Sequence, residues 1–546
     1  MADIVLGGTV APSGPNPIAR NSNVLGTEQQ VFDVTGRDAI PDHLRTEGLT
    51  AYVVSTGEVF RLVGGITNGD WLEVERTPIQ FANRAALAAY DVLHTEVGAL
   101  AYVLSQRAYF KLAQSTATVA LPPAGVSATL ANDATSPSPG TRSWCRLWIP
   151  APDWQYQAEW HIGEGGDDEL DGHNETYRLG SFEEIQWRLA GLYSRSITIF
   201  LKTLALPTDE ITLVLVPIQA PVLSSDPMTI TVKPETVPPF GTPSTVVSYV
   251  YTGGVSAPVI RVNDPAPGYY YGNGSFVRIT TGGSDVRYAW VIEDLGVVSP
   301  GTRDYVISYP MNDTTFTYST DPALGDTIEG LLPFGLVTGF EIIVPGTASY
   351  PTDYAVRYEM LILAGTKKSD ALMTYCIASA NTWDGDRVKF RCCMLTTNTV
   401  MRTRLQEYEF CAFVGGSGAT GMGVYGERAS FFASMMYKSG LVFFGVSDIR
   451  FDIVGSYEMT SGVCVDLQRG SYFTLPQVGV WSGGGNQNSL AVDRGSRATI
   501  RGGASVICTG DAVVSDGATA VATWAAFTAF PTPRVVVSAY GSFLTD

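Results

Sequence analysis

The chain has 546 residues, several times the length of a typical domain, so we expect several structural units. Only 16% of the residues are charged, while Gly and Pro number 57 and 31, a composition that favours short strands and tight turns and predicts an all-β fold. The 53 acidic and 35 basic residues give a formal net charge of -18, which excludes nucleic acid as an expected partner because its phosphates would be repelled.

Motifs that carry chemistry are few in this sequence. The seven cysteines show no CxxC spacing and lie in apolar or alternating runs, so we expect buried free thiols rather than a zinc site or disulfides. The four histidines are scattered, no nucleophile-elbow or phosphate-loop motif occurs, and no cofactor is expected. The sequence has no signal-peptide pattern and no stretch near the ~20 apolar residues of a membrane span, so we expect synthesis in a cytoplasm and no membrane insertion.

The N-terminal region, residues 1–30, is rich in Gly, Pro, Asn and Ser and shows no hydrophobic period. Such a segment does not bury enough apolar surface to form a core of its own. We therefore expect an extended arm that docks onto another protein.

Two similar segments follow, residues 31–76 and 77–113. We match Arg37 to Arg84, 47 residues apart, and Tyr52 to Tyr102, 50 residues apart, and interpret the pattern as a tandem duplication with small loop insertions. Each copy predicts a short helical turn followed by a two-stranded hairpin, that is, a small α+β module. Because a unit of this size buries little apolar surface, we expect the modules to pack on each other or on neighbouring chains.

Residues 114–142 have the composition of a linker, and residues 143–370 predict a β-rich region. Within it, Ser181 followed by Glu184 forms a capping-box pattern that predicts a helix near 181–192, and strand-like runs recur after it. This arrangement is typical of a capped β-solenoid, which can begin in this region. No pattern places the part from about 235 to 370.

The C-terminal region, residues 371–546, predicts a parallel β-helix. Alternating strands such as 388–392 are separated by turns, and the Gly-small turns at Gly470, Gly495 and Gly517 lie 25 and 22 residues apart. A period of about 20 to 25 residues fits one coil of a solenoid, in which inward apolar side chains stack from coil to coil. A β-sandwich, whose strands also recur at short intervals, is the alternative.

Together these features resemble the tail fibres and tailspikes of tailed bacteriophages. The resemblance lies in the N-terminal modules, notably 37–40, 48–57 and 68–71, and in the C-terminal repeats. It implies a homotrimer located in the virion as a tail or baseplate appendage, attached through its N-terminal region to other virion tail or baseplate proteins. It also implies that the distal β-helix meets a host surface polysaccharide or receptor.

Candidate site residues fall into three groups. Two carboxylate pairs at i, i+2, Asp384 with Asp386 and Glu407 with Glu409, would each project from one face of a strand, and glycoside hydrolysis needs two flanking carboxylates. The loop holding Asp167, Asp168 and Asp171 offers oxygen ligands for calcium but lacks the spacing of an EF-hand. Trp154 and Trp160 are candidates for stacking on sugars. For each group the alternative is an ordinary role: solvated acids, a solvated loop and core aromatics.

The leading hypothesis is a virion structural protein, a tail fibre or tailspike that mediates attachment to the host cell surface without catalysis. The alternative is a polysaccharide depolymerase, a glycoside hydrolase or lyase of the β-helix type, with the two carboxylate pairs as its candidate groups. A bacterial surface adhesin is weakened by the missing signal-peptide pattern.

Overall fold

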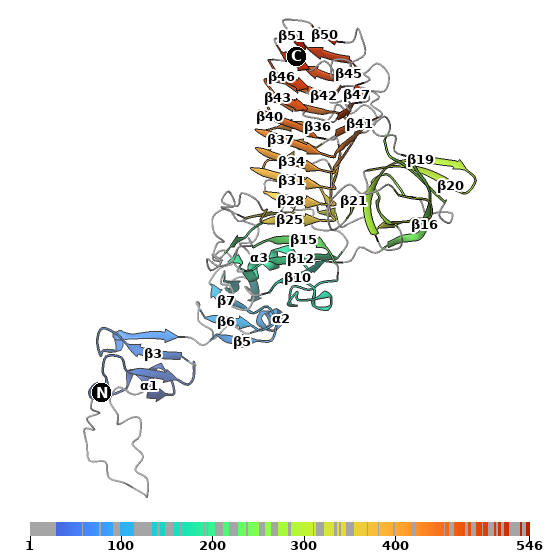
Figure 1. Cartoon of the computed structure of the whole chain (residues 1–546). Helices are drawn as coiled ribbons and strands as arrows, with labels where there is room; N and C mark the ends of the chain where they lie inside the picture. The colour runs from blue at the N-terminus through green and yellow to red at the C-terminus, as the bar shows by residue number, and fades with distance from the viewer. Residues whose placement is uncertain are drawn as a thin grey trace. The chain divides into compact units, whose positions relative to one another are not determined.

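The computed structural model describes residues 29–545 with internal gaps, the longest of which cover 114–133, 523–534, 218–227, 148–156, 313–321 and 345–353. The chain divides into two compact units, one formed by Met1–Leu121 with Ala131–Ile149 and the other by Pro122–Leu130 with Pro150–Asp546 (Figure 1). Most of the expected arm, residues 1–28, lies outside the described residues. In the described part of the chain, no helix is long and apolar enough to cross a membrane.

The first unit begins with a four-stranded sheet in the order β1-β2-β3-β4, in which β1 is parallel to β2 and the other pairs are antiparallel. Its core is formed by Ile40, Leu49, Ala51, Leu62 and Trp71, which are all buried. The elements are β1 (Gln29–Val31), α1 (Val34–Asp38), η2 (Asp42–Leu44), β2 (Thr50–Val53), β3 (Glu58–Leu62), η3 (Asn68–Asp70) and β4 (Trp71–Glu75).

The second copy repeats β1, α1, β2 and β3 at an offset of 50 residues, and the counterpart of β4 comes later in the chain, after an insertion. Asp33 and Asn83 cap the two short helices in the same way, each accepting a hydrogen bond from the backbone three residues on. The strand β9 carries Trp144 beside Leu112, as β4 carries Trp71 beside Leu62. The elements are β5 (Ile79–Phe81), α2 (Arg84–Ala88), β6 (Leu100–Val103), β7 (Ala108–Ala113), β8 (Ala134–Ser138) and β9 (Arg142–Arg146), in the sheet order β5-β6-β7-β9-β8.

This offset corrects one match made from the sequence. Arg37 corresponds to Leu87 and not to Arg84, because the helices start at Val34 and Arg84. The Arg37 guanidinium lies 4.2 Å from the centre of the Phe60 ring, so its side chain fills the buried position that Leu87 fills in the second copy. Because a charged residue, Arg37, occupies this buried position in the first copy, matching arginine to arginine gave the wrong alignment of the two copies.

The second unit contains a parallel β-helix, as the sequence predicted, with three sheets that we call sheets A, B and C in their order along each coil (Figure 1). Sheet A has 13 strands: β10 (Glu159–Gly163), β12 (Ile197–Lys202), β15 (Ile230–Pro234), β25 (Val356–Glu359), β28 (Ala371–Thr374), β31 (Arg387–Arg391), β34 (Leu405–Glu409), β37 (Arg428–Phe432), β40 (Asp448–Asp452), β43 (Tyr472–Leu475), β46 (Arg497–Ile500), β49 (Thr519–Ala522) and β51 (Ser542–Thr545). Sheet B has nine: β23 (Leu336–Val337), β26 (Ile362–Leu363), β29 (Ile377–Ala378), β32 (Met394–Thr396), β35 (Ala412–Val414), β38 (Met435–Tyr437), β41 (Val454–Tyr457), β44 (Gly479–Trp481) and β47 (Ile507–Cys508). Sheet C has nine: β27 (Thr366–Lys367), β30 (Thr382–Trp383), β33 (Val400–Met401), β36 (Met422–Tyr425), β39 (Leu441–Phe444), β42 (Val463–Gln468), β45 (Asn488–Val492), β48 (Asp511–Val514) and β50 (Val535–Val537).

Stacked side chains hold the coils together. In sheet A, Phe390, Tyr408, Phe431 and Phe451 occupy one register position in four successive strands, and their ring centres lie 4.5 to 5.5 Å apart. Buried aromatic pairs at such distances contribute about 0.5–1.5 kcal/mol each beyond their area. Strands in parallel register replace the antiparallel pairing that the β-sandwich alternative required.

The repeated Gly-Ser pairs of the sequence form tight corners. Gly470 and Gly495 have φ angles of 78° and 74°, which glycine adopts at low cost. The following serines are buried and link adjacent coils, because Ser496 Oγ accepts a hydrogen bond from the Ser471 N–H at 3.1 Å. Ser471 Oγ accepts one from the Val446 N–H in the same way, at 3.2 Å.

The parallel pairing starts at β10, well before residue 371, and α3 (Phe182–Leu189) covers the first coils where the sequence predicted a capping helix. Phe182, Ile185 and Leu189 point into the coil core. The remaining short elements are η6 (Glu175–Tyr177), β11 (Leu192–Tyr193) paired with β14 (Val216–Pro217), and β13 (Ile211–Val214) paired with β24 (Phe340–Ile343).

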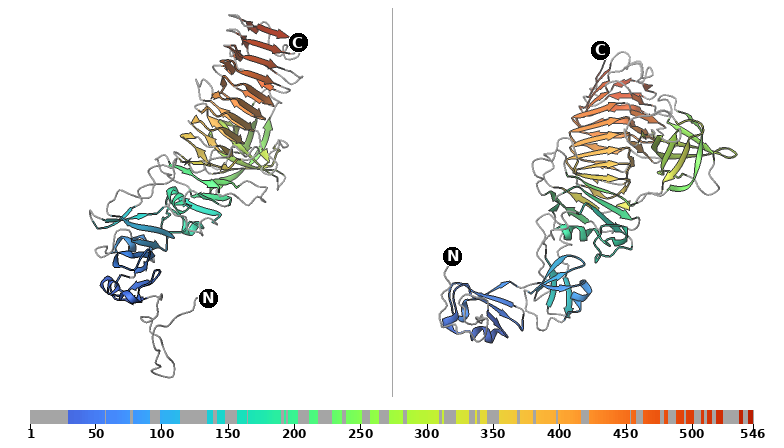
Figure 2. Two further views of the ribbon diagram at one scale, coloured as in Figure 1. Left: turned by 90° about the vertical axis from the view of Figure 1, so that its left-hand side faces the viewer. Right: turned by 60° about the horizontal axis from the view of Figure 1, so that its bottom comes forward.

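A second domain is inserted into the coil. Ile230 of β15 pairs directly with Val356 of β25, and between them the chain from β16 to β22, residues 239–331, leaves the coil to form an antiparallel sheet beside it (Figure 2). Pairing of β18 with β19 closes this sheet, so we call it the inserted barrel. Its strands are β16 (Pro239–Val250), β17 (Val259–Asn263), β18 (Phe276–Thr281), β19 (Asp285–Ser299), β20 (Thr302–Ile307), β21 (Met311–Asn312) and β22 (Thr327–Leu331).

The inserted barrel packs on the outer face of sheet B. Phe276 and Trp290 of the barrel join one buried cluster with Phe410 and Met435 of the coil. The Trp290 indole N–H donates a buried hydrogen bond of 2.7 Å to the Cys392 carbonyl. The contact therefore combines apolar burial with one specific polar anchor.

Candidate functional site

The predicted pair Glu407 and Glu409 lies on the outer face of β34, where the preceding coil supplies positive charge. Lys389 Nζ lies 3.2 Å from Glu407 and 2.5 Å from Glu409, and Arg391 Nε lies 2.9 Å from Glu409. Burial raises the pKa of Glu409, but the hydrogen bond and charge of Lys389 outweigh burial and the net shift is downward. A general acid needs a raised pKa, so these ion pairs are suited to stabilising the contact between adjacent coils and not to acid catalysis.

The other pair, Asp384 and Asp386, is exposed at the start of β31. Arg404 binds Asp386 through two nitrogens, at 2.6 and 3.0 Å, and also contacts Glu427. The hydrogen bond from Arg404 lowers the pKa of Asp386. The two predicted pairs thus lie on adjacent coils, and three of the four carboxylates are held by basic side chains.

The acidic loop before α3 is organised by its own hydrogen bonds. Asp168 accepts bonds of 2.9 Å from the backbone N–H groups of Gly180 and Ser181 and one of 2.8 Å from the Ser181 hydroxyl. Asp167 accepts from the Glu169 N–H, and Asp171 is paired with His173. Within the residues that the structure describes, no three ligating side chains lie close enough to hold a metal ion.

The aromatic candidates divide between the core and the undescribed part of the chain. Trp160 lies on β10 with its side chain in the coil core and no exposed surface, so neither ring face is open to a sugar. The reason is the strand alternation, which turns Trp160 inward and His161 outward. Trp154 lies outside the described residues.

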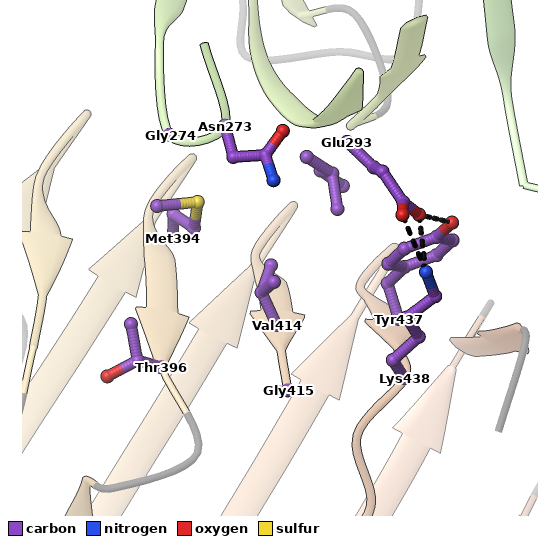
Figure 3. Close-up of a pocket in the computed structure, with 10 residues that line it drawn as sticks. Asn273, Gly274, Glu293, Met394, Thr396, Val414, Gly415, Tyr437 and Lys438 are labelled. Carbon is purple, nitrogen blue, oxygen red and sulfur yellow. Dashed lines mark hydrogen bonds and ion pairs between the residues drawn. The ribbon is translucent and has the colours of Figure 1, made fainter. Parts of the chain in front are cut away.

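A groove that the sequence did not indicate lies where the inserted barrel meets sheet B (Figure 3). Its volume is about 390 Å³, within the range of small-ligand sites. We call it the insert groove, and it is lined by Asn273, Gly274, Ile292 and Glu293 of the barrel and by Met394, Thr396, Val414, Gly415, Tyr437 and Lys438 of the coil.

The regular stacking of the coil builds one wall of the insert groove. Thr396, Val414 and Tyr437 occupy the same register position in β32, β35 and β38, so their side chains form one row on the outer face of sheet B. Gly415 follows this row, and a Cβ added there would lie 2.1 Å from the Lys438 carbonyl oxygen. Only glycine fits where the coil turns at this point.

The polar groups of the insert groove come from both domains. Glu293 accepts hydrogen bonds from the Lys438 ammonium, 2.7 Å from each oxygen, and from the Tyr437 hydroxyl (Figure 3). Burial raises the pKa of Glu293, but these bonds and the Lys438 charge lower it overall. Asn273 Oδ1 accepts from the Asp294 N–H at 3.0 Å, which leaves its amide nitrogen facing the groove.

Sequence reasoning missed this site because its two halves are distant in the chain. Glu293 and Lys438 are 145 residues apart, and no local motif joins them. The available signal was the unbroken apolar run in strands of sheet B, for example Met435 to Tyr437. Alternate residues of a strand face away from the core, so such a run predicts that the outer face is covered, and in the structure all three residues are buried.

Comparisons with known proteins give two likenesses among solved structures. No family model and no curated protein matches the chain. A structure described as a glycoside hydrolase is 9% identical, covers 71% of this chain and 96% of its own, and has a TM-score of 0.25. The crystal structure of the tailspike protein gp49 from Pseudomonas phage LKA1 is 12% identical, covers 65% of this chain and 67% of its own, and has a TM-score of 0.18. Neither TM-score reaches the range of a shared fold.

Proposed function

We propose that the chain is a bacteriophage tail fibre or tailspike that binds a host surface polysaccharide through the insert groove and does not cleave it. The observation that carries this proposal is the groove itself, in which a stacked coil and an inserted barrel present apolar and polar groups to one small-ligand volume. A stacked coil is also a stiff support, because the strands of each coil are hydrogen-bonded to the strands of the next.

Binding without cleavage is favoured by the state of the carboxylates. Glu409, Asp386 and Glu293 all have pKa values shifted downward by basic partners. Hydrolysis of a glycosidic bond requires one carboxylic acid that stays protonated beside one carboxylate. These three carboxylates are therefore suited to forming ion pairs that stabilise the fold, and not to donating a proton.

The depolymerase alternative has its best candidate in the insert groove rather than in the predicted pairs. Glu293, Tyr437 and Lys438 bring a carboxylate, a phenol and an ammonium group together beside the groove. If cleavage occurs, we expect it to depend on these three groups.

The remaining parts of the proposal concern assembly. We propose that the N-terminal region attaches the protein to other tail or baseplate proteins, that the protein is a homotrimer, and that it is made in the host cytoplasm and located in the virion. Support comes from apolar residues that the first module exposes, Phe32 at 73% and Val54 at 45%, since exposed apolar patches often mark protein contacts.

The experiment that tests the function uses purified full-length protein and labelled host surface polysaccharide. We expect saturable binding, loss of binding by at least about tenfold in Val414→Trp, which fills the groove, and unchanged binding in Val442→Trp. Val442 is a matched control because it is a half-buried valine on the outer face of another sheet. Shortening of the polysaccharide, abolished by Glu293→Gln, would favour the depolymerase alternative.

A further inference from the structure

We infer that the insert groove binds a neutral sugar unit carrying an acetamido group. This inference rests on the proposed function and narrows it to a ligand class. Three features of the groove lead to it: its charge balance, its apolar wall and its unused amide donor.

The charge balance selects a neutral ligand. Glu293 and Lys438 are the charged side chains that line the groove, and they neutralise each other through two bonds of 2.7 Å. A uronic acid or a phosphorylated sugar would have to break this pair to find a cation, and a free amino sugar would have to break it to find an anion. Either exchange leaves one charge unpaired and partly desolvated, which is costly.

The apolar wall selects a methyl group. Met394, Val414 and Ile292 face the groove from both domains and offer no hydrogen-bond partner for a hydroxyl group. In the parent hexose a hydroxyl group replaces the acetamido group, and against these side chains that hydroxyl would lose its hydrogen bonds to water. The methyl end of an acetamido group would instead gain apolar contact there.

The amide donor selects the carbonyl of the same group. The Asn273 side-chain oxygen is used by the Asp294 N–H, so its nitrogen is oriented toward the groove and is available to an acceptor (Figure 3). A carbonyl oxygen is a strong acceptor for such a donor. Thr396 lines the same groove and donates its hydroxyl proton to the Ala378 carbonyl at 3.4 Å, which leaves its oxygen able to accept from the acetamido N–H.

The test measures binding of single sugars to the full chain by saturation-transfer NMR and calorimetry. The probes are N-acetylglucosamine and N-acetylgalactosamine, compared with glucose, galactose and glucuronic acid. We expect the acetylated sugars to bind about tenfold or more tightly than the others, and Asn273→Asp, which removes the donor, to weaken them about tenfold. Val414→Trp should abolish this binding and Val442→Trp should not change it.

The outcomes separate this inference from the proposed function. If parent hexoses bind as tightly as their acetylated forms, and Val414→Trp abolishes polysaccharide binding, the ligand class is wrong while the attachment site stands. If Val414→Trp leaves the binding of the acetylated sugars unchanged, the groove is not their site and the inference is overturned. If acetylated sugars bind in the groove but no host polysaccharide does, the inference stands and the attachment function fails.

Discussion

At the scale of single residues, the corner between sheets A and B shows how side chains override backbone preference. Five successive coils turn there through a residue with positive φ that is not glycine, between 45° and 56°. A left-handed residue with a Cβ costs about 1–2 kcal/mol. The five residues are Met360, Tyr375, Cys392, Phe410 and Ala433. The cost is offset because the side chains of all but Met360 are buried in the cluster that joins the coil to the inserted barrel.

We expect Ala433→Gly to destabilise the protein unusually little. The smallest side chain of the column has little packing to lose, and glycine relieves the strained φ of 45°, so unfolding free energy should change by less than about 1 kcal/mol. The control is Ala429→Gly, four residues away in the buried strand β37, which should lose about 1 kcal/mol or more. Urea-induced unfolding measures both, and equal losses would contradict a strained corner.

The buried cysteines give a second prediction at this scale. Burial raises the pKa of Cys376, Cys393 and Cys411, so the folded protein holds protons that the unfolded chain releases near pH 8.5. Their contribution to stability is complete below that pH and is lost as pH rises above it. We expect the urea midpoint to be similar at pH 6.5 and 7.5 and lower at pH 9.5.

A thiol reagent checks the same point independently. In native protein these thiols should react far more slowly than in urea, because only the exposed thiolate attacks the reagent. Cys393→Ser is a suitable variant for removing one buried thiol. Cys393 Sγ accepts a hydrogen bond from the Cys376 N–H, and in a later coil Ser434 Oγ accepts the equivalent bond from the Cys411 N–H. Fast labelling of the native chain would contradict the burial of these thiols.

At the scale of elements, the coil was predictable and the inserted barrel was not. The alternation of apolar and polar residues in strands such as Val388 to Phe390 indicates which side chains face the core, and the spacing of Gly470 and Gly495 indicates where the coil turns. Both signals are local in the sequence. The barrel strands alternate in the same way, but their closure depends on which strand pairs with which, and Ile230 pairs with Val356 across 126 positions. The candidate acids were visible in the sequence, whereas Lys389 and Arg404, which pair with them, come from neighbouring coils.

The barrel's attachment to the coil depends on Trp290. We expect Trp290→Phe to weaken docking by about 1–3 kcal/mol, because the Cys392 carbonyl remains buried without its donor. Hydrogen exchange should then increase at the sheet B surface under the barrel and not in β43 or β46. The control is Trp383→Phe, where the indole nitrogen has no hydrogen-bond partner among the described residues, and docking should be unchanged. Equal exchange in both variants would show that the hydrogen bond is not the anchor.

At the scale of the whole molecule, the outer face of sheet A predicts self-association. Phe432, Tyr472 and Leu544 lie on strands of this sheet and expose 40%, 52% and 54% of their surface. Exposed apolar residues along one face are favourable when another chain covers them. We expect light scattering to give the mass of a trimer, and Phe432→Glu with Tyr472→Glu to give monomers with the coil still folded. A stable wild-type monomer would contradict the homotrimer.

We propose that the insert groove holds a host saccharide intact. The most direct measurement is a crystal structure of the full chain soaked with an oligosaccharide prepared from the host surface. We predict density for a sugar between Asn273 and Val414, with every glycosidic bond present and the Glu293–Lys438 pair unbroken. An empty groove with the oligosaccharide bound elsewhere on the coil, or a cleaved product beside Glu293, would contradict the account.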